Sequence, residues 1–336
     1  MDRASRERLQ RLLPRKFVCI DIGARGGLDF PWKGLKDCVR GVFFEPDPDE
    51  FARLSARGGD TVVLPHAVSR QAGAQTLHLT KARRCSSLLR PNMALLGHFP
   101  ESDRFTVETS APVQTVTIDA LHREGALPEG DFIKIDTQGA ERDILVGGQA
   151  FVREHVLGLQ VEVAFRPLYE GQPLFHELDN YIREEFGLEL VDISMNYWKY
   201  TAGIGLGPKK GQLVVGDALY FPHPEQVVAR CARLDPDKAA EKTAMACVMA
   251  LAYGYVDYAM LLLELEKPQA ILAPQLREGL LAVCARHGRC LTLDFPGTAI
   301  LDQGLRMLLG ACRVAYHGWG TASSGLGSRK KFGFFY

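Results

Sequence analysis

The chain has 336 residues, of which 46% are hydrophobic and 24% are charged, a composition typical of a folded protein and unlike that of disordered or fibrous chains. Lysine and arginine together number 40, as do aspartate and glutamate, so no overall positive charge favours nucleic acid as a partner. The eight cysteines form no C-x-x-C pair and several lie in apolar runs, which indicates buried free thiols and a reducing, cytoplasmic location.

The first segment, residues 1–16, is charged and amphipathic, and it lacks the apolar stretch of a secretory signal. From residue 17 to about 221, short β-branched and aromatic runs alternate with amphipathic or loop segments, which is typical of a parallel sheet covered by helices. The predicted strands are residues 17–22, 41–45, 61–65, 132–136, 157–165, 188–193 and 213–221. The sequence therefore predicts an α/β, doubly wound fold with a seven-stranded, mostly parallel sheet.

The last two predicted strands are separated only by a loop rich in glycine, lysine and aromatic residues. A parallel pair would need a longer, usually helical crossover, so we expect these strands to pair antiparallel. Between the third and fourth strands, residues 75–128 form an insertion with two further strand-like runs, 76–80 and 105–118. This insertion is a candidate substrate lid within a first domain that spans residues 1–222.

Beyond residue 222 the strand signals stop, and residues 223–320 show helical patterns that are interrupted at Pro236, Pro268, Pro274 and Pro296. We expect an α-helical domain of unknown role. It could cap the site, form a homo-oligomer or bind a biosynthetic partner.

Residues 243–263 are apolar enough to raise the alternative of a membrane span. Asp257 interrupts them, and their Tyr, Gly and Ala content favours a buried helix, so no membrane span is predicted. Residues 321–336 are rich in glycine, serine and basic residues before a final aromatic cluster, and they are predicted to form a flexible tail.

The first strand runs into a glycine-bearing turn, Asp21-Ile-Gly-Ala-Arg-Gly-Gly27, where the backbone can bend sharply and approach a ligand closely. The second strand ends at Glu45, before Pro46, and a carboxylate in this position can accept both ribose hydroxyl protons of a nucleoside. Each feature alone is explained by a structural turn or a solvent-facing glutamate. Together they predict a nucleoside site.

Two further carboxylates belong to predicted strands. Asp136 ends the fourth strand, where its side chain can face the ligand crevice or cap the helix that begins near Glu141. Glu162 lies in an apolar strand, where a carboxylate is costly unless it is paired or functional. A structural ion pair between Glu162 and Lys134 is the alternative to a functional role.

Candidate acceptor-binding groups lie in the insertion and near the end of the sheet. Residues 81–92 combine a cationic cluster with hydroxyl and amide groups that can hold an anionic or polyhydroxylated acceptor, and a solvated basic loop is the alternative. Farther on, the aromatic side chains of Tyr197 and Trp198 could stack on a sugar, although core packing explains them equally well. The candidate substrate residues are Arg84, Ser86, Ser87, Asn92, Gln138, Tyr197 and Trp198.

Residues 17–221 resemble the FkbM family of S-adenosylmethionine-dependent methyltransferases, whose fold closes a parallel sheet with an antiparallel edge strand. The resemblance rests on separate runs: D-x-G-A at 21–24 with Gly27, F-E-P-x-P at 44–48, T-x-D-x-L at 117–121, K-I-D-x-x-G-x-E at 134–141, and the strand glutamate Glu162. Two departures stand out. Arg25 replaces the family's usual Asn, and Thr137-Gln138 stand where Asp-Val-Glu-Gly would place Val and Glu.

The resemblance implies that S-adenosylmethionine is the cofactor and that the acceptor is a hydroxyl of a sugar, glycan or polyketide-type small molecule. Asp136 and Glu162 are the candidate catalytic residues, as the base or its orienter. The predicted cofactor-binding residues are Asp21, Gly23, Ala24, Arg25, Gly27, Glu45, Pro46, His66, Ala67 and Asp136. His66 is assigned to the adenine side.

Three alternatives stay open. A divalent ion held by Asp136 and Glu162 is compatible with the chemistry of carboxylates, but no third ligand can be named and no metal site is predicted. A non-catalytic binding or assembly protein built on a degenerate methyltransferase domain is the second function class. A nicotinamide-dependent oxidoreductase is the third, and it is opposed by Arg25, which stands where the dinucleotide fingerprint needs a glycine.

Overall fold

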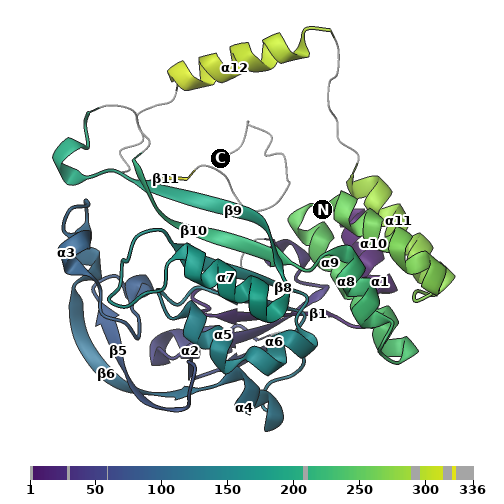
Figure 1. The fold of residues 1–336 in the computed structure, drawn as a ribbon, viewed down its shortest axis with the longest axis horizontal. Coiled ribbons are helices and arrows are strands. Elements are labelled where there is room, and N and C mark those ends of the chain that lie inside the picture. The colour runs from purple at the N-terminus through teal and green to yellow at the C-terminus, as the bar shows by residue number, and fades with distance from the viewer. Residues whose placement is uncertain are drawn as a thin grey trace.

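The computed structural model describes residues 3–28, 31–58, 60–206, 211–288, 296–312 and 320–322. Its centre is one large sheet, shown in Figure 1. The strands of this sheet are β1 (Phe17–Ile22), β2 (Val39–Phe44), β3 (Thr61–Leu64), β7 (Phe132–Ile135), β8 (Gly158–Ala164), β9 (Glu189–Trp198), β10 (Gln212–Phe221) and β11 (Gly320–Ala322). Their spatial order is β11-β9-β10-β8-β7-β1-β2-β3.

The strand directions agree with the prediction. From β3 through β2, β1 and β7 to β8, every neighbouring pair is parallel, whereas β10 pairs antiparallel with both β8 and β9. The seven predicted strands and the antiparallel last pair are therefore confirmed. The short edge strand β11, which pairs antiparallel with β9, was not predicted.

The insertion forms a second, smaller sheet. Its strands are β4 (Ala67–Val68), β5 (Gly73–Thr80) and β6 (Val107–Val116), in the order β4-β6-β5. β5 and β6 pair antiparallel along most of their length, so both strand-like runs predicted in the insertion are strands. The connection between them holds three short helical elements: η2 (Arg83–Cys85), α3 (Met93–Leu96) and η3 (Ser102–Phe105).

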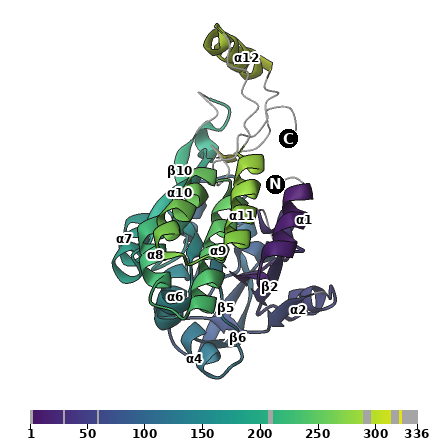
Figure 2. The same ribbon diagram turned by 90° about the vertical axis from the view of Figure 1, so that its right-hand side faces the viewer.

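Helices cover both faces of the large sheet because its strands are apolar on both sides. In β1, Val18, Ile20 and Ile22 face one core, whereas Phe17 and Cys19 face the other. The first core is covered by α4 (Ile118–Arg123), α5 (Glu141–Gly147), α6 (Gln149–His155) and α7 (Phe175–Phe186). The second is covered by α1 (Arg3–Leu12), α8 (Pro224–Cys231), α9 (Pro236–Tyr253), α10 (Val256–Glu266) and α11 (Pro274–His287), which Figure 2 shows face on.

Helix α9 covers a face of the sheet on which the described part of the β1–β2 connection provides no long helix. The described part of that connection contains only the short helix η1 (Trp32–Leu35), while residues 244–253 of α9 are all fully buried. The backbone of β8 and helix α9 approach each other closely. A Cβ added at Gly158 in β8 would lie only 2.6 Å from Met249 Sδ in α9. The helices after residue 222 thus share a core with the sheet, and a domain boundary at that residue stays a prediction.

Proline and glycine residues mark helix ends in the region after residue 222, as the sequence predicted for the prolines. Pro236 and Pro274 stand at the first position of α9 and α11, and Gly254, with φ of 90°, ends α9. The apolar stretch 243–263 is therefore two packed helices. Within the described part of the chain, no helix combines the length and apolarity needed to cross a bilayer.

Two further sequence predictions concern the cysteines and the C-terminal tail. The cysteines at positions 19, 38, 85, 231, 247 and 284 are buried free thiols, whereas Cys290 lies outside the described residues. So do residues 323–336 of the predicted flexible tail. The remaining helices are α2 (Pro48–Ser55) beside β3, the short η4 (Thr201–Gly203) and η5 (Lys267–Gln269), and α12 (Thr298–Cys312), which stands apart from the other elements (Figures 1 and 2).

Candidate active site

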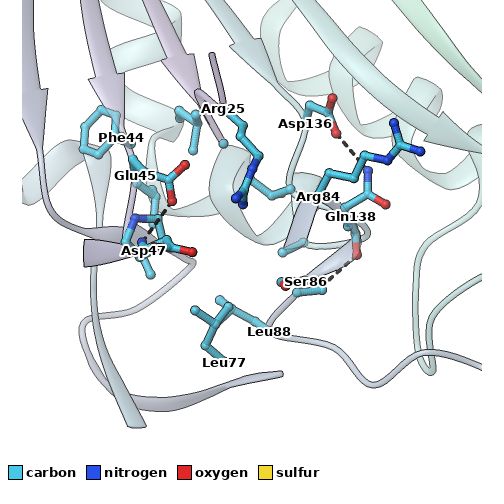
Figure 3. Close-up of a pocket in the computed structure, with 18 of the residues that line it drawn as sticks. Arg25, Phe44, Glu45, Asp47, Leu77, Arg84, Ser86, Leu88, Asp136 and Gln138 are labelled. Atoms are coloured by element: carbon cyan, nitrogen blue, oxygen red, sulfur yellow. Dashed lines mark hydrogen bonds between the residues drawn. The ribbon is translucent and has the colours of Figure 1, made fainter. Parts of the chain in front are cut away.

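A cavity of about 330 Å³ lies at the carboxyl ends of β1, β2 and β7, which is where ligands bind in open α/β sheets. The insertion closes its opposite wall (Figure 3). From the sheet side and the segment after β3 it is lined by Ile22, Gly23, Arg25, Phe44, Glu45, Pro46, Asp47, His66, Ala67, Val68, Lys134, Asp136, Thr137, Gln138 and Ala140. From the insertion it is lined by Leu77, Leu79, Arg83, Arg84, Ser86, Ser87 and Leu88.

The glycine turn after β1 is required by the packing of neighbouring strands. Gly23 has φ of 85°, and a Cβ at this position would lie 2.1 Å from the backbone oxygen of Asp136 at the end of β7. The amide of Gly23 also donates to the carbonyl of Phe44 at 3.2 Å. The turn therefore joins the ends of β1, β2 and β7, and it presents bare backbone to the cavity.

The turn is braced from behind by α2. Glu50 Oε1 accepts a hydrogen bond from the amide of Gly26 at 3.0 Å, and the Arg57 guanidinium donates to the carbonyl of Gly26. Asp47 caps α2 by accepting from the amides of Asp49 and Glu50. These contacts hold the turn in one conformation and leave the Arg25 side chain exposed toward the cavity.

Glu45 follows β2 directly and points into the cavity (Figure 3). Only 6% of its surface is exposed, and Oε1 accepts a hydrogen bond from the amide of Asp47 at 2.9 Å. Burial raises the pKa of Glu45, while the hydrogen bond from Asp47 and the charge of Arg25 act in the opposite direction. A buried carboxylate at this point is suited to accept hydrogen bonds from ligand hydroxyls.

Gln138 connects the two candidate catalytic carboxylates. Its Nε2 donates to Asp136 Oδ1 at 2.9 Å and to Glu162 Oε2 at 2.8 Å, and its Oε1 accepts from the Tyr169 hydroxyl at 2.9 Å. Its backbone has φ of 61°, a left-handed conformation that is uncommon for residues other than glycine. Both amide hydrogens of Gln138 are therefore committed to carboxylates within the protein.

Asp136 and Glu162 differ in their access to the cavity. Asp136 lines it, whereas Glu162 lies behind Gln138 in β8. Burial raises the pKa of Glu162 well above that of an ordinary glutamate, and the neighbouring charges of Asp136 and Glu141 add to this increase. Glu162 thus retains its proton to a higher pH than an exposed glutamate, and only Asp136 faces the space where a substrate would lie.

Glu141 orders the loop between β7 and α5. Its Oε1 accepts hydrogen bonds from the amides of Thr137 and Gly139, each at 3.0 Å, and from the Thr137 hydroxyl at 3.1 Å. Burial raises the pKa of Glu141 to about 7. The residue before α5 is Ala140, so the helix-capping role considered for Asp136 is not seen, and Glu141 organises this turn instead.

Lys134 and Asp21 form a buried ion pair below the cavity. Their positions are paired in the β1–β7 register, and Lys134 Nζ lies 3.6 Å from Asp21 Oδ1. Asp21 is only 2% exposed and does not line the cavity. The pair therefore places a lysine under the carboxyl ends of the strands.

The insertion is attached to the sheet edge by hydrogen bonds. The Ser87 hydroxyl donates to the carbonyl of Gln138 at 2.8 Å, and the Tyr169 hydroxyl is within 2.9 Å of the carbonyl of Cys85. Ser86 Oγ accepts from the amide of Thr80 at 3.1 Å. The segment that carries Arg84, Ser86 and Ser87 is thus held against the residues that follow β7.

The structure brings together most of the predicted site residues. The cavity is lined by the predicted cofactor-binding residues Gly23, Arg25, Glu45, Pro46, His66, Ala67 and Asp136, and by the predicted substrate residues Arg84, Ser86, Ser87 and Gln138. Asp21, Ala24 and Gly27 belong to the same turn but do not line the cavity, because Asp21 pairs with Lys134 and Ala24 packs with Phe43 and Leu54. Their proposed role is structural support of the turn.

Three predicted substrate residues lie outside the cavity lining. Asn92 caps α3 through its carbonyl oxygen, and its amide donates to the carbonyl of Pro167 at 3.0 Å. Trp198 is buried against the ring of Phe99, with ring centres 5.4 Å apart. Tyr197 is buried next to it in β9. The core-packing alternative describes the position of Trp198, whereas Tyr197 is buried with its hydroxyl 3.5 Å from Met195 Sδ.

Several cavity residues were not predicted from the sequence. Phe44, Leu77, Leu79 and Leu88 supply apolar surface, and Thr137 adds a hydroxyl. Leu77 and Leu79 could have been found, because residues two apart in a strand point to the same side. Within the described residues, no group of three or more His, Cys, Asp or Glu side chains is placed to hold a metal ion.

Comparison with known proteins gave one family match. The sequence profile described as "Methyltransferase FkbM domain" matches residues 21–189, just over half of the 336 residues. This range includes the glycine turn, Glu45, Asp136 and Glu162. A comparison with curated proteins gave no match.

Solved structures with a similar fold are also methyltransferases. A methyltransferase FkbM from Methylobacillus flagellatus has 15% identity and a TM-score of 0.34, with 60% of this chain and 43% of that protein covered. This chain thus matches less than half of that protein's length. A 1,6-didemethyltoxoflavin-N1-methyltransferase from Burkholderia thailandensis, with bound S-adenosylhomocysteine, has 15% identity, coverage of 66% and 77%, and a TM-score of 0.30. A precorrin-6y C5,15-methyltransferase from Geobacter metallireducens has 13% identity, coverage of 66% and 90%, and a TM-score of 0.28.

Proposed function

Because the chain belongs to the FkbM family of S-adenosylmethionine-dependent methyltransferases, we propose that it methylates a hydroxyl group of a small-molecule or glycan acceptor. One observation carries the proposal: a buried nucleoside-type carboxylate, Glu45, and the carboxylate of Asp136 line the same cavity. The reaction needs a cofactor site and an acceptor site that meet at one point. The sheet edge and the insertion supply two walls for such a meeting point.

The cavity residues fit S-adenosylmethionine. The left-handed Gly23 presents backbone without a side chain, the buried Glu45 can accept from the ribose hydroxyls, and the exposed Arg25 can pair with the carboxylate of the methionine part. His66 and Ala67, after β3, lie on the adenine side in this arrangement. A volume of about 330 Å³ lies within the usual range of small-molecule sites.

When bound, S-adenosylmethionine supplies a methyl group on a positively charged sulfur, and transfer breaks the C–S bond, forms a C–O bond and returns the electron pair to sulfur. The hydroxyl proton of the acceptor must leave, and in this proposal Asp136 takes it because its carboxylate faces the cavity. Gln138 and Glu162 act as positioning residues, since the amide of Gln138 fixes the Asp136 carboxylate from behind. The insertion forms the cavity wall that faces these groups.

A first prediction tests Asp136. We expect Asp136→Asn to lower methyl transfer by a factor of about 100 or more, the usual loss when a general base is removed, while S-adenosylhomocysteine still binds. Transfer would be measured from methyl-tritiated S-adenosylmethionine to a panel of sugars and other hydroxylated acceptors, and binding by calorimetry.

The matched control for this prediction is Asp103→Asn, which changes an exposed aspartate of the insertion. Full transfer activity in Asp136→Asn would remove this residue from the mechanism. If the unmodified chain failed to bind either S-adenosylmethionine or S-adenosylhomocysteine at millimolar concentration, the proposed function itself would be wrong.

A further inference from the structure

On the acceptor side of the cavity, Arg84 forms no ion pair with a carboxylate of the described chain. Arg84 lies in η2, which follows β5 directly, and its side chain lines the cavity. The neighbouring Cys85 is buried, and its carbonyl lies 2.9 Å from the Tyr169 hydroxyl, which is also 2.9 Å from Gln138 Oε1, so the backbone that bears Arg84 lies against the sheet edge. The backbone at Arg84 is therefore fixed at the cavity wall, and its side chain is exposed.

The other cationic side chains of the cavity either form ion pairs or lie on the cofactor side. Arg83 lies 3.8 Å from Glu108, and Lys134 pairs with Asp21. Among the described residues, Arg25 and Arg84 are the cavity-lining arginines without an ion pair. Arg25 belongs to the glycine turn on the cofactor side, whereas Arg84 belongs to the insertion and is drawn beside Asp136 and Gln138 in Figure 3.

A second arginine reinforces the charge at this place. Arg104 lies over the rings of Phe105 and Trp198, with its guanidinium carbon 4.8 Å and 5.2 Å from their centres. Burial lowers the pKa of Arg104, and the positive charge of Arg84 contributes to this decrease. Two guanidinium groups that repel each other favour the approach of an anion to the exposed one, Arg84.

We propose that the acceptor of this methyltransferase is an anionic hydroxyl compound, and that Arg84 binds its carboxylate or phosphate while the hydroxyl group lies near Asp136. This inference rests on the proposed function, because it assigns the acceptor side of the same cavity. Arg84 is a specificity-determining residue: its planar guanidinium can donate two parallel hydrogen bonds to a carboxylate or a phosphate. A neutral acceptor would leave this cation without a partner next to the substrate.

The test uses the full chain saturated with S-adenosylhomocysteine, so that no turnover occurs. Binding of D-glucuronate, glucose 6-phosphate and neutral D-glucose would be compared by calorimetry, and inorganic phosphate would be added while the Arg84 side-chain N–H signal is followed by NMR. We expect phosphate to shift this signal and at least one charged sugar to bind at least tenfold more tightly than glucose. The carboxylate and phosphate sugars distinguish the two sources of negative charge.

The control is another cation of the insertion, Lys81, which does not line the cavity. Arg84→Gln is expected to abolish the preference for the charged sugars, whereas Lys81→Gln, which removes a lysine paired with Asp103 at 2.6 Å, is expected to retain it. Equal binding of glucose and the charged sugars, no binding of any charged probe, or equal effects of the two substitutions would overturn the inference. The proposed function fails separately, through loss of S-adenosylhomocysteine binding in the unmodified chain.

Discussion

Two buried carboxyl groups, Glu162 and Glu141, lie outside the cavity lining and close to Asp136, which lines it. The charge of Asp136 raises the pKa of both glutamates, and the amide of Gln138 donates to Asp136 and to Glu162. A glutamine suits this position better than another acidic side chain would, because it donates hydrogen bonds to both neighbours. The departure from the family motif at Gln138 thus has a local structural reason.

The raised pKa values of these groups predict how stability depends on pH. Burial raises the pKa of Glu141 to about 7 and that of Glu162 well above its ordinary value. The folded state then holds more protons than the unfolded state, so the free energy of unfolding falls as pH rises from about 4.3 through the folded pKa values. Between about pH 5 and about pH 8 we expect a decrease on the order of 2 kcal/mol, measured by urea denaturation.

Glu162→Gln is expected to flatten this pH dependence, because it removes one of the two groups. The exposed Glu124→Gln is the control and should retain the slope of the unmodified chain. Glu45, whose pKa burial also raises, and His78 and His155, whose pKa values burial lowers and which oppose the slope, are present in both variants. Asp131, whose pKa is lowered, acts only at lower pH. The same pH slope in Glu162→Gln and in the unmodified chain would contradict this explanation.

Contacts between elements explain the glycines of the turn after β1 and the small residues of helix α9. The turn carries glycines because β7 approaches it, and α9 is rich in alanine where it lies against the sheet. At the amino end of β7, Asp131 is fully buried and accepts from Arg15 at 2.5 and 2.7 Å, from the amide of Val18 and from Lys242 in α9 at 3.1 Å. This cluster ties α9 to the sheet.

The turn can be tested with two glycines in left-handed conformations. Gly23→Ala should lower the free energy of unfolding by about 3 kcal/mol and abolish S-adenosylhomocysteine binding, because the new methyl group would collide with the backbone of Asp136. Gly26→Ala should cost only about 1 kcal/mol, since a Cβ added at Gly26 would meet no atom within 4 Å. Urea denaturation and calorimetry measure both; equal effects would show that strand approach is not the cause.

The tie between α9 and the sheet can be tested with two lysines. Lys242→Met should lower the free energy of unfolding by about 3 kcal/mol, because it removes a partner of a fully buried carboxylate. Lys238→Met, which removes a half-exposed lysine paired with Glu129, should cost less than about 1 kcal/mol. Urea denaturation distinguishes them, and a loss from Lys242→Met as small as that from Lys238→Met would contradict the structural role of the cluster.

The molecule as a whole depends on helices that follow the family-matched segment. The profile match ends at residue 189, yet α8–α11 cover one face of the sheet and bury Phe17, Phe132, Leu219 and Phe221. A chain without these helices would expose a large apolar surface to water. The segment 224–287 therefore acts as a layer of the fold, and any role in oligomer formation or partner binding comes in addition.

A truncation after residue 222 tests this dependence. We expect the shortened chain to be insoluble or to lack cooperative unfolding, because its sheet would be uncovered on one face. A chain truncated after residue 312, which retains α8–α11, is the control and should unfold cooperatively. Circular dichroism with urea denaturation is the measurement. A soluble 1–222 chain that unfolds cooperatively and binds S-adenosylhomocysteine would establish that segment as an independent domain.

Much of the fold and part of the site could be predicted from local patterns in the sequence. Alternating and continuous apolar runs identified the strands, the short connection before β10 required an antiparallel pair, and the glycine turn with Glu45 marked the sheet edge at which the cavity lies. These features depend on neighbouring residues and on covalent chain length. They are therefore visible without the tertiary structure.

Other features depend on contacts between residues far apart in the chain, which no local pattern specifies. Only the packed structure showed that α9 replaces a helix absent from the described part of the β1–β2 connection. It also showed that Gln138 bridges Asp136 and Glu162, while the side chains of Asn92 and Trp198 are turned into structural contacts. The glycine turn and Glu45 thus identify an edge of the sheet, but the shape and charge of the cavity come from an insertion folded back upon it.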